Sequence, residues 1–92
     1  MYKYKNFSAS GLVQAGGGSA IGIIIHSNSS GTIKLWDNTS AAGTVFDNEM
    51  SLGATERFIP LFGKEYKVGL YVTIGGTADI GIVYDPNVPI NS

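Results

Sequence analysis

The stretch GLYVTIGGTADIGIVYD, residues 69–85, contains two runs in which apolar residues alternate with other residues, on either side of a glycine-rich segment. The alternating apolar positions are Leu70, Val72, Ile74, Ile80, Ile82 and Tyr84. A period of two residues is typical of a β-strand with one buried face, because successive side chains point to opposite sides of the strand. The segment from Gly75 to Asp79 has residue types that favour a turn, with Asp79 as a turn residue. This stretch therefore predicts two strands joined by a turn.

The same period continues toward the amino terminus in IIIHSNSSGTIKLWD, residues 23–37. A helical stripe is not evident in any segment of ten or more residues, and residues 45–57 favour at most a short helical turn. We expect strands at residues 4–9, 11–15, 19–26, 31–37, 43–47, 55–62, 66–74 and 78–84, and further turns at residues 27–31, 37–43 and 63–65. Short, evenly spaced strands with polar, glycine-rich connections are typical of antiparallel sandwiches and small barrels. The predicted fold is all-β: a single antiparallel β-sandwich, jelly-roll-like, with about eight short strands joined as hairpins.

Two facing sheets bury one side of every strand, and the alternation indicates which side that is. The predicted core consists of Ile21, Ile23, Ile25, Ile33, Leu35, Phe58, Leu70, Val72, Ile74, Ile80 and Ile82. In the run FIPLF, residues 58–62, the inward face is ambiguous because every position is apolar. Pro60 has no backbone N–H to donate, so this strand is expected at a sheet edge or at a bulge.

The composition limits how such a small fold can be stabilised and what it can bind. The chain has 92 residues and no cysteine, which excludes disulfides and thiolate metal sites. Six basic and seven acidic residues are scattered along it, so no basic stripe is present to neutralise phosphates. Nucleic acid and anionic membranes are therefore not expected as partners. The segment MYKYKNFSAS lacks the apolar region of a signal peptide, and no apolar run approaches the roughly 20 residues of a membrane span.

The low content of charged residues indicates that part of the surface is normally covered. Charged residues make up 14% of the chain, against about 25% in an average soluble domain. A small domain with little charge and a net charge near zero tends to associate with itself. We expect a sandwich domain at residues 1–85 and an extended C-terminal arm at residues 86–92. The arm carries the apolar Val88 and Ile90, and it is expected to lie either on its own sandwich or on a neighbouring subunit.

Catalytic and metal-binding groups do not form a motif in this sequence. Nucleophilic catalysis needs a nucleophile, a base and an orienting group, but His26 is the single histidine and no nucleophile elbow is present. His26 follows an apolar run and is interpreted as a residue at the rim of the core. The carboxylates are too dispersed for metal-ligand spacing. We therefore expect a non-enzymatic protein with no catalytic residues, cofactor or metal; a small enzyme using His26 and a calcium site assembled by the fold are the alternatives.

Trp36, Asp37, Asn38 and Tyr71 are the candidate contact residues, together with Val88 and Ile90 of the arm. Trp36 alternates with Leu35, so it is expected on the outer face of its sheet. There it could be covered by another subunit, stack on a sugar, or pack within its own domain. The low charge favours the subunit contact.

The segments SGTIKLWDNTSAAGT (residues 30–44) and GLYVTIGGTADIGIVYD (residues 69–85), together with SGLVQAGGG and IGIIIHS, resemble small all-β proteins encoded by tailed bacteriophages and prophages. Members of this group are met as virion structural proteins of head-decoration or head-fibre type. The resemblance implies a jelly-roll-like sandwich that forms a homo-oligomer, expected to be a trimer.

The expected function is that of a non-enzymatic virion protein, a capsid decoration or fibre-type component that acts by self-association and by docking on a virion surface. Its expected partners are other copies of itself, other virion proteins and, as an option, glycans. The resemblance places it in the virion, after assembly in the host cytoplasm. The alternative function is a carbohydrate-binding module that uses an exposed Trp36 platform.

Overall fold

The computed structural model describes residues 2–26, 29–51 and 57–86, without the side chains of residues 44 and 47–51. The strands are β1 (Lys3–Phe7), β2 (Gly11–Ala15), β3 (Gly18–Ile25), β4 (Thr32–Asp37), β5 (Thr44–Ser51), β6 (Arg57–Tyr66), β7 (Gly69–Gly75) and β8 (Ile80–Asp85). Each one overlaps a strand expected from the alternation. The helical turn considered for residues 45–57 is wrong up to Ser51, because β5 occupies that segment. The part of the arm at residues 87–92 lies outside the described residues.

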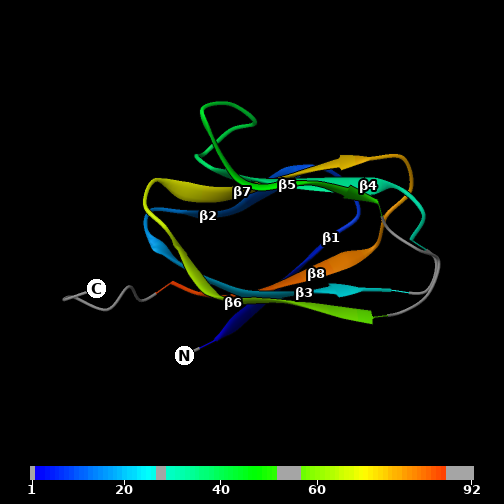
Figure 1. Cartoon of the computed structure of the whole chain (residues 1–92), viewed down its shortest axis with the longest axis horizontal. Helices are drawn as coiled ribbons and strands as arrows, with labels where there is room; N and C mark the ends of the chain where they lie inside the picture. Colours follow the sequence, from blue (N-terminus) through cyan, green and yellow to red (C-terminus); the bar gives the residue numbers. More distant parts are fainter. Residues whose placement is uncertain (1, 27–28, 52–56, 87–92) are drawn as a thin grey trace.

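The eight strands form two four-stranded antiparallel sheets, with the orders β1-β8-β3-β6 and β2-β7-β4-β5. Figure 1 shows the two sheets as layers that face each other. The pairs β1–β8, β2–β7, β3–β6 and β4–β5 are nested around the middle of the chain, and β3–β8 and β4–β7 join them into sheets. A long antiparallel hairpin rolled up on itself produces this arrangement, which is a jelly roll. The predicted fold class is confirmed.

The expectation that neighbouring strands form hairpins is wrong for most of the described strands. Only β4 and β5 are consecutive along the chain and also paired. The stretch at residues 69–85 contributes β7 to one sheet and β8 to the other, and the stretch at residues 23–37 likewise divides between β3 and β4. The alternation identifies a strand and its buried side, but the partner of each strand is set by contacts far away in the sequence.

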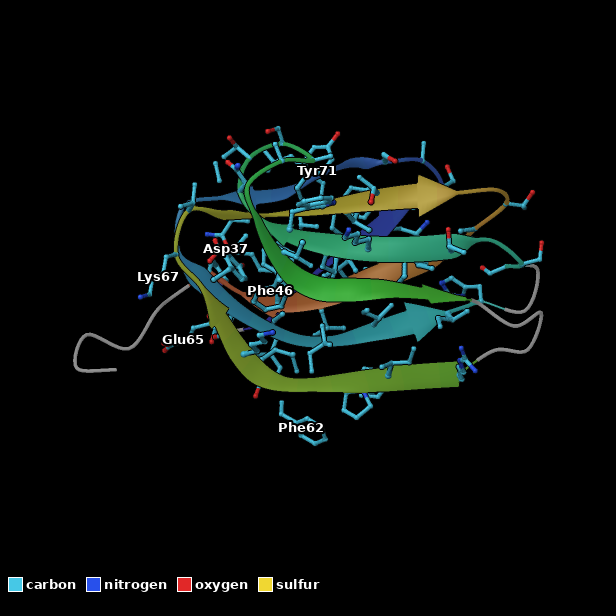
Figure 2. All side chains as sticks on the ribbon, turned by 45° about the horizontal axis from the view of Figure 1, so that its top comes forward. Asp37, Phe46, Phe62, Glu65, Lys67 and Tyr71 are labelled. Carbon is cyan, nitrogen blue, oxygen red and sulfur yellow. The ribbon has the colours of Figure 1, made fainter. Side chains whose placement is uncertain are left out.

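The core lies between the two sheets and contains most of the residues that the alternation indicated. Eight predicted core residues are buried: Ile23, Ile25, Ile33, Leu35, Leu70, Val72, Ile80 and Ile82. Burial of each such side chain contributes about 1.5–3 kcal/mol to stability. Aromatic residues missed by the prediction extend this core, including Phe46 and Tyr66, which meet edge to face with ring centroids 6.0 Å apart. Figure 2 shows Phe46 between the layers.

A bulge in β3 explains why Ile21 is not in the core. The register of β3 shifts between Ala20 and Gly22 against both of its neighbours, β6 and β8. Ala20 and Ile23 are both fully buried although they are three residues apart, so one extra residue interrupts the alternation. Ile21 falls at this interruption and is only half-buried. The prediction also overstated Ile74, which packs against the core but is only partly buried.

Strand β6 is an edge strand with a wider irregularity of its own. The three residues between Pro60 and Lys64 lie opposite the single residue between Ala20 and Gly22 of β3, and Phe62 and Gly63 have positive φ angles of 58° and 73°. The strand continues to Tyr66, so the turn expected at residues 63–65 is wrong. The placement of Pro60 at an edge or bulge is confirmed. Phe58 is 52% exposed, against its prediction as a core residue, because Ile59 occupies the inward side.

Candidate functional site

Trp36 and Tyr71 lie side by side on the outer face of the sheet β2-β7-β4-β5. They are direct partners across β4 and β7, and Leu12 and Val45 continue the same row onto β2 and β5. We call the outer side of this sheet, with the row Leu12, Tyr71, Trp36 and Val45, the tryptophan face. Figure 2 shows Tyr71 on this outer layer, away from Phe46.

Neighbouring polar groups hold the Trp36 indole in place. Its Nε1 donates a hydrogen bond to Thr73 Oγ1 at 3.3 Å, and Thr73 Oγ1 donates to the carbonyl of Lys34 at 3.3 Å. The ammonium of Lys34 lies 4.5 Å from the centroid of the indole ring, in cation–π geometry. Trp36 and Tyr71 are both half-buried. Packing within the sandwich therefore accounts for much of the surface of the indole.

Asp37 clamps the turn between β6 and β7. Its carboxylate accepts hydrogen bonds from the backbone N–H groups of Lys67 at 3.0 Å, Val68 at 2.9 Å and Gly69 at 3.4 Å. Burial alone would raise the pKa of Asp37, but these hydrogen bonds and the charge of Lys67 outweigh it and hold the pKa below its usual value. Figure 2 shows Asp37 and Lys67 at the same end of the sandwich.

Asn38 organises the loop between β4 and β5 in a similar way. Its Nδ2 donates to the carbonyl of Ala42 at 2.8 Å, and its Oδ1 accepts from the N–H of Thr39 at 2.7 Å. The structure thus brings the four described candidates to one region, but the polar atoms of Asp37 and Asn38 already bind loop backbone. Val88 and Ile90, the other two candidates, lie outside the described residues.

The most exposed aromatic side chains of the two sheets lie on the opposite side of the sandwich, on the outer face of β1-β8-β3-β6. Phe62 is 89% exposed, Phe58 52% and Tyr4 51%. Two ladder rows cross this face; their members are Tyr4, Val83, Gly22 and Pro60 in the first and Asn6, Gly81, Ile24 and Phe58 in the second. We call this side the phenylalanine face. Figure 2 shows Phe62 projecting from β6 away from the rest of the molecule.

Two of these rings rest directly on glycine. A Cβ atom at Gly81 would lie 2.2 Å from the Tyr4 ring, and one at Gly22 would lie 2.2 Å from the Phe58 ring. The rings therefore pack against bare backbone, which covers the glycines and steadies the sheet. About half of each of these two residues stays exposed. The sequence shows the glycines and the aromatic residues, but it does not show which of them meet, because that depends on which strands are neighbours in the sheet.

A chain of hydrogen bonds connects residues at one end of the phenylalanine face. Tyr4 Oη donates to Asn6 Oδ1 at 2.9 Å, and Asn6 Nδ2 donates to Asp79 Oδ1 at 2.9 Å. His26 follows β3, is half-buried, and has its Nε2 3.4 Å from Tyr4 Oη. The chain ties β1 to the end of β3 and to the loop before β8.

At that same end, the buried Ser29 links the loop before β4 to the loop before β8. Its hydroxyl donates to the carbonyl of Asp79 at 2.9 Å and accepts from the N–H of Asp79 at 2.8 Å.

Within residues 2–26, 29–51 and 57–86, no three His, Asp or Glu side chains are placed to hold a metal ion, and no pocket is present. The described part of the chain also has no helix long and apolar enough to cross a membrane.

Comparison of the chain with family models, with curated proteins and with solved structures gave no match.

Proposed function

We propose that this chain is a non-enzymatic structural protein of a bacteriophage virion, a decoration or fibre-type component that works by binding copies of itself and a virion surface. The virion setting follows from the sequence resemblance, and the jelly-roll fold agrees with what that resemblance implies. The observation that carries the self-association is the phenylalanine face, where Phe62, Phe58 and Tyr4 are each more than half exposed. Exposed aromatic residues gathered on one face mark interaction surfaces.

The edges of this sheet are less suited to association than its face. At one edge, β1 carries the exposed Lys3 and Lys5, and lysines on an edge strand oppose pairing with another chain. At the other edge, β6 is interrupted by Pro60 and by the irregularity that includes Phe62. Both devices discourage strand addition. Association through side chains on the face is left as the favoured mode.

Sedimentation of the purified chain over a range of concentrations tests the proposal. We expect reversible formation of oligomers at tens of micromolar, favoured by salt because apolar contacts dominate. A chain that sediments as a monomer throughout this range would contradict self-association. The virion setting is tested separately by mass spectrometry of purified phage particles, in which the chain should appear in fixed proportion to the major capsid protein.

A carbohydrate-binding module that uses Trp36 is the second candidate function. It is favoured by one observation, the direct pairing of Trp36 with Tyr71 on an outer face. It receives less support than self-association because Lys34 lies over the indole and Thr73 takes its N–H. Titration with a panel of glycans should change the tryptophan emission if a sugar stacks on the ring, and unchanged emission across the panel would exclude this site.

A further inference from the structure

We infer that Lys5 and Lys64 close the two open sides of the sandwich, and that they thereby prevent copies of this chain from joining strand to strand into a continuous sheet. The inference goes beyond the proposed function, because it concerns the edges of the sheets and holds whether or not the phenylalanine face binds a second copy. Three features shared by the two lysines carry it: the side of the strand on which each one lies, the carbonyl group that it binds, and the buried ring that it contacts.

Each sheet has two edge strands, which have a neighbouring strand on one side only. They are β1 and β6 in one sheet and β2 and β5 in the other. The backbone groups on the free side of an edge strand can pair with a strand of another chain, and such pairing leads to aggregation. Repulsion between copies offers little protection here, because the net charge is only -1 at pH 7. The edges therefore need a specific defence.

Both lysines lie on the inner side of an edge strand. Lys5 of β1 pairs with Ile82, and Lys64 of β6 pairs with Ala20. Ile82 and Ala20 are fully buried core residues, and directly paired residues of antiparallel strands have their side chains on the same face of the sheet. The two lysine side chains therefore start on the core side of their strands. Inward-pointing charged residues on edge strands are one of the ways in which natural sheets prevent pairing with other chains.

Each ammonium group reaches the other sheet and binds a carbonyl group there. Lys5 Nζ donates to the carbonyl of Leu12 in β2 at 3.2 Å, and Lys64 Nζ donates to the carbonyl of Phe46 in β5. Because β2 and β5 are the two edge strands of that sheet, each lysine joins an edge of one sheet to an edge of the other. A strand added along β2 or β5 would have to displace this charged donor.

Both carbonyl groups lie at β-bulges. The register of β2 against β7 shifts between Leu12 and Gln14, so Val13 is an extra residue in β2. The register of β5 against β4 likewise leaves Phe46 as an extra residue, and Val13 and Phe46 are both buried. A bulge interrupts the regular ladder of backbone hydrogen bonds and bends the strand. The bulge and the lysine act at the same point of each edge strand, so an incoming strand finds no regular row of partners there.

A buried phenylalanine helps to hold each ammonium group in this position. Lys5 Nζ lies 5.7 Å from the centroid of the Phe7 ring, and Lys64 Nζ lies 4.6 Å from the centroid of the Phe46 ring. The attraction between a cation and the face of an aromatic ring adds to the hydrogen bond. The same set of contacts occurs at both open sides of the sandwich, although the two lysines come from distant segments of the sequence. This repetition indicates a common role for them.

The first test observes the two contacts in the parent chain by NMR spectroscopy of the lysine ammonium groups. The protons of Lys5 and Lys64 should exchange with water more slowly than those of Lys67, an exposed residue in the turn between β6 and β7. Slower exchange is expected because a bound ammonium group must leave its acceptor before it exchanges. Exchange as fast as that of Lys67 would overturn the inference.

The second test removes each charge and leaves an apolar stem of similar length. Under native conditions with agitation, Lys5→Met and Lys64→Met should each form aggregates that bind thioflavin T, with a lag several-fold shorter than that of the parent chain. Lys67→Met removes the same charge away from the sheet edges and should keep the lag of the parent chain. Lysine variants that aggregate no faster than Lys67→Met would overturn the inference.

A less stable fold also aggregates faster, so the same assay includes Asp37→Ala as a destabilised variant. This substitution removes the acceptor of the turn backbone and leaves both lysines in place. Lys5→Met and Lys64→Met should aggregate faster than Asp37→Ala although urea denaturation shows a smaller loss of free energy of unfolding for them. Lag times that follow the free energy of unfolding alone would overturn the inference. Oligomers formed through the phenylalanine face would not bind thioflavin T, so the proposed function is judged separately by sedimentation.

Discussion

The two outer faces of the sandwich both carry aromatic residues, but they present them in different ways. On the tryptophan face, Trp36 donates to Thr73, lies under Lys34 and is half-buried. On the phenylalanine face, Phe62 projects from a bulge with 89% of its surface exposed, and Phe58 leaves about half of its ring open over Gly22. The difference shows that a neighbour's size and a backbone irregularity decide the exposure of an aromatic residue more than its position on an outer face does.

The comparison also separates residues that stabilise the monomer from residues that contribute to association. The aromatic residue of the tryptophan face is engaged by its own chain, so it should contribute to the stability of the monomer. Phe62 is 89% exposed, and its positive φ lowers the stability of the folded chain. Its favourable contribution should therefore appear only in association. Substitution of Trp36 should therefore lower the free energy of unfolding of the monomer, whereas substitution of Phe62 should leave it unchanged or raise it. The following four experiments test this difference from the largest effect to the smallest.

Removal of the indole should destabilise the monomer most. Trp36→Ala should lower the free energy of unfolding by about 2–3 kcal/mol, which is somewhat less than for a fully buried tryptophan. Phe62→Ala should change it by less than about 0.5 kcal/mol. Urea denaturation of both variants at low protein concentration measures the difference. If both variants lost the same free energy of unfolding, the two faces would not differ in their contribution to the stability of the monomer.

Removal of the Asp37 carboxylate, which binds the turn between β6 and β7, should have the next largest effect on the free energy of unfolding. Asp37→Ala leaves three backbone N–H groups of the turn without their acceptor, and about 1–2 kcal/mol of stability should be lost. Glu65→Ala, which removes an exposed acidic residue on the other face, is the control and should be nearly neutral. Denaturation at pH 7 compares them, and a neutral Asp37→Ala would show that water replaces the carboxylate.

Acidification should remove the effect of Asp37. Its pKa lies below the ordinary value of 3.8 in the folded chain, so the unfolded chain binds this proton first as pH falls. The contribution is fully present above that ordinary value and is lost as pH decreases through the folded pKa. The stability difference between the parent chain and Asp37→Ala should therefore be constant near neutral pH and shrink below about pH 4. A difference that grows on acidification would contradict the lowered pKa.

The smallest effect should have the opposite sign. Phe62→Asn should raise the free energy of unfolding of the monomer by about 0.5–1 kcal/mol, because asparagine adopts positive φ at lower cost than phenylalanine. Phe58→Asn, which uncovers the backbone of Gly22, should lower it by a similar amount. Thermal denaturation at a protein concentration too low for self-association measures both. A destabilised Phe62→Asn would mean that the ring already serves its own chain.

The sequence predicted each strand that the structure describes, because strands with one buried face follow a local rule. The runs around Leu70 and Ile80 alternate cleanly, and their residues are buried as expected. The pairing of strands was not predictable in this way, since β7 and β8 look alike in the sequence but belong to different sheets. Ile21 was assigned to the core because a bulge depends on the neighbouring strands, which no local pattern contains.

The candidate site was predicted only in part, because the alternation shows which side of a strand a residue lies on but not which residues of other strands lie beside it. Trp36 and Tyr71 were expected to contact something on an outer face, and the structure makes them neighbours on one. The phenylalanine face was missed because Phe58 was assigned to the core in a run where every residue is apolar. The choice between Phe58 and Ile59 depends on which side of β6 faces the second sheet.

The nested pairing of the strands also determines the order in which the two sheets can form during synthesis. β8 lies between β1 and β3, and it is the strand with which β1 pairs. β1 therefore leaves the ribosome long before its partner exists, and one sheet has a gap at its centre until seven other strands have been made. The hairpin of β4 and β5 is local and can form early, but closure of the roll must wait for β8. Until β8 has been made, β1 and β3 lack the strand that joins them into one sheet.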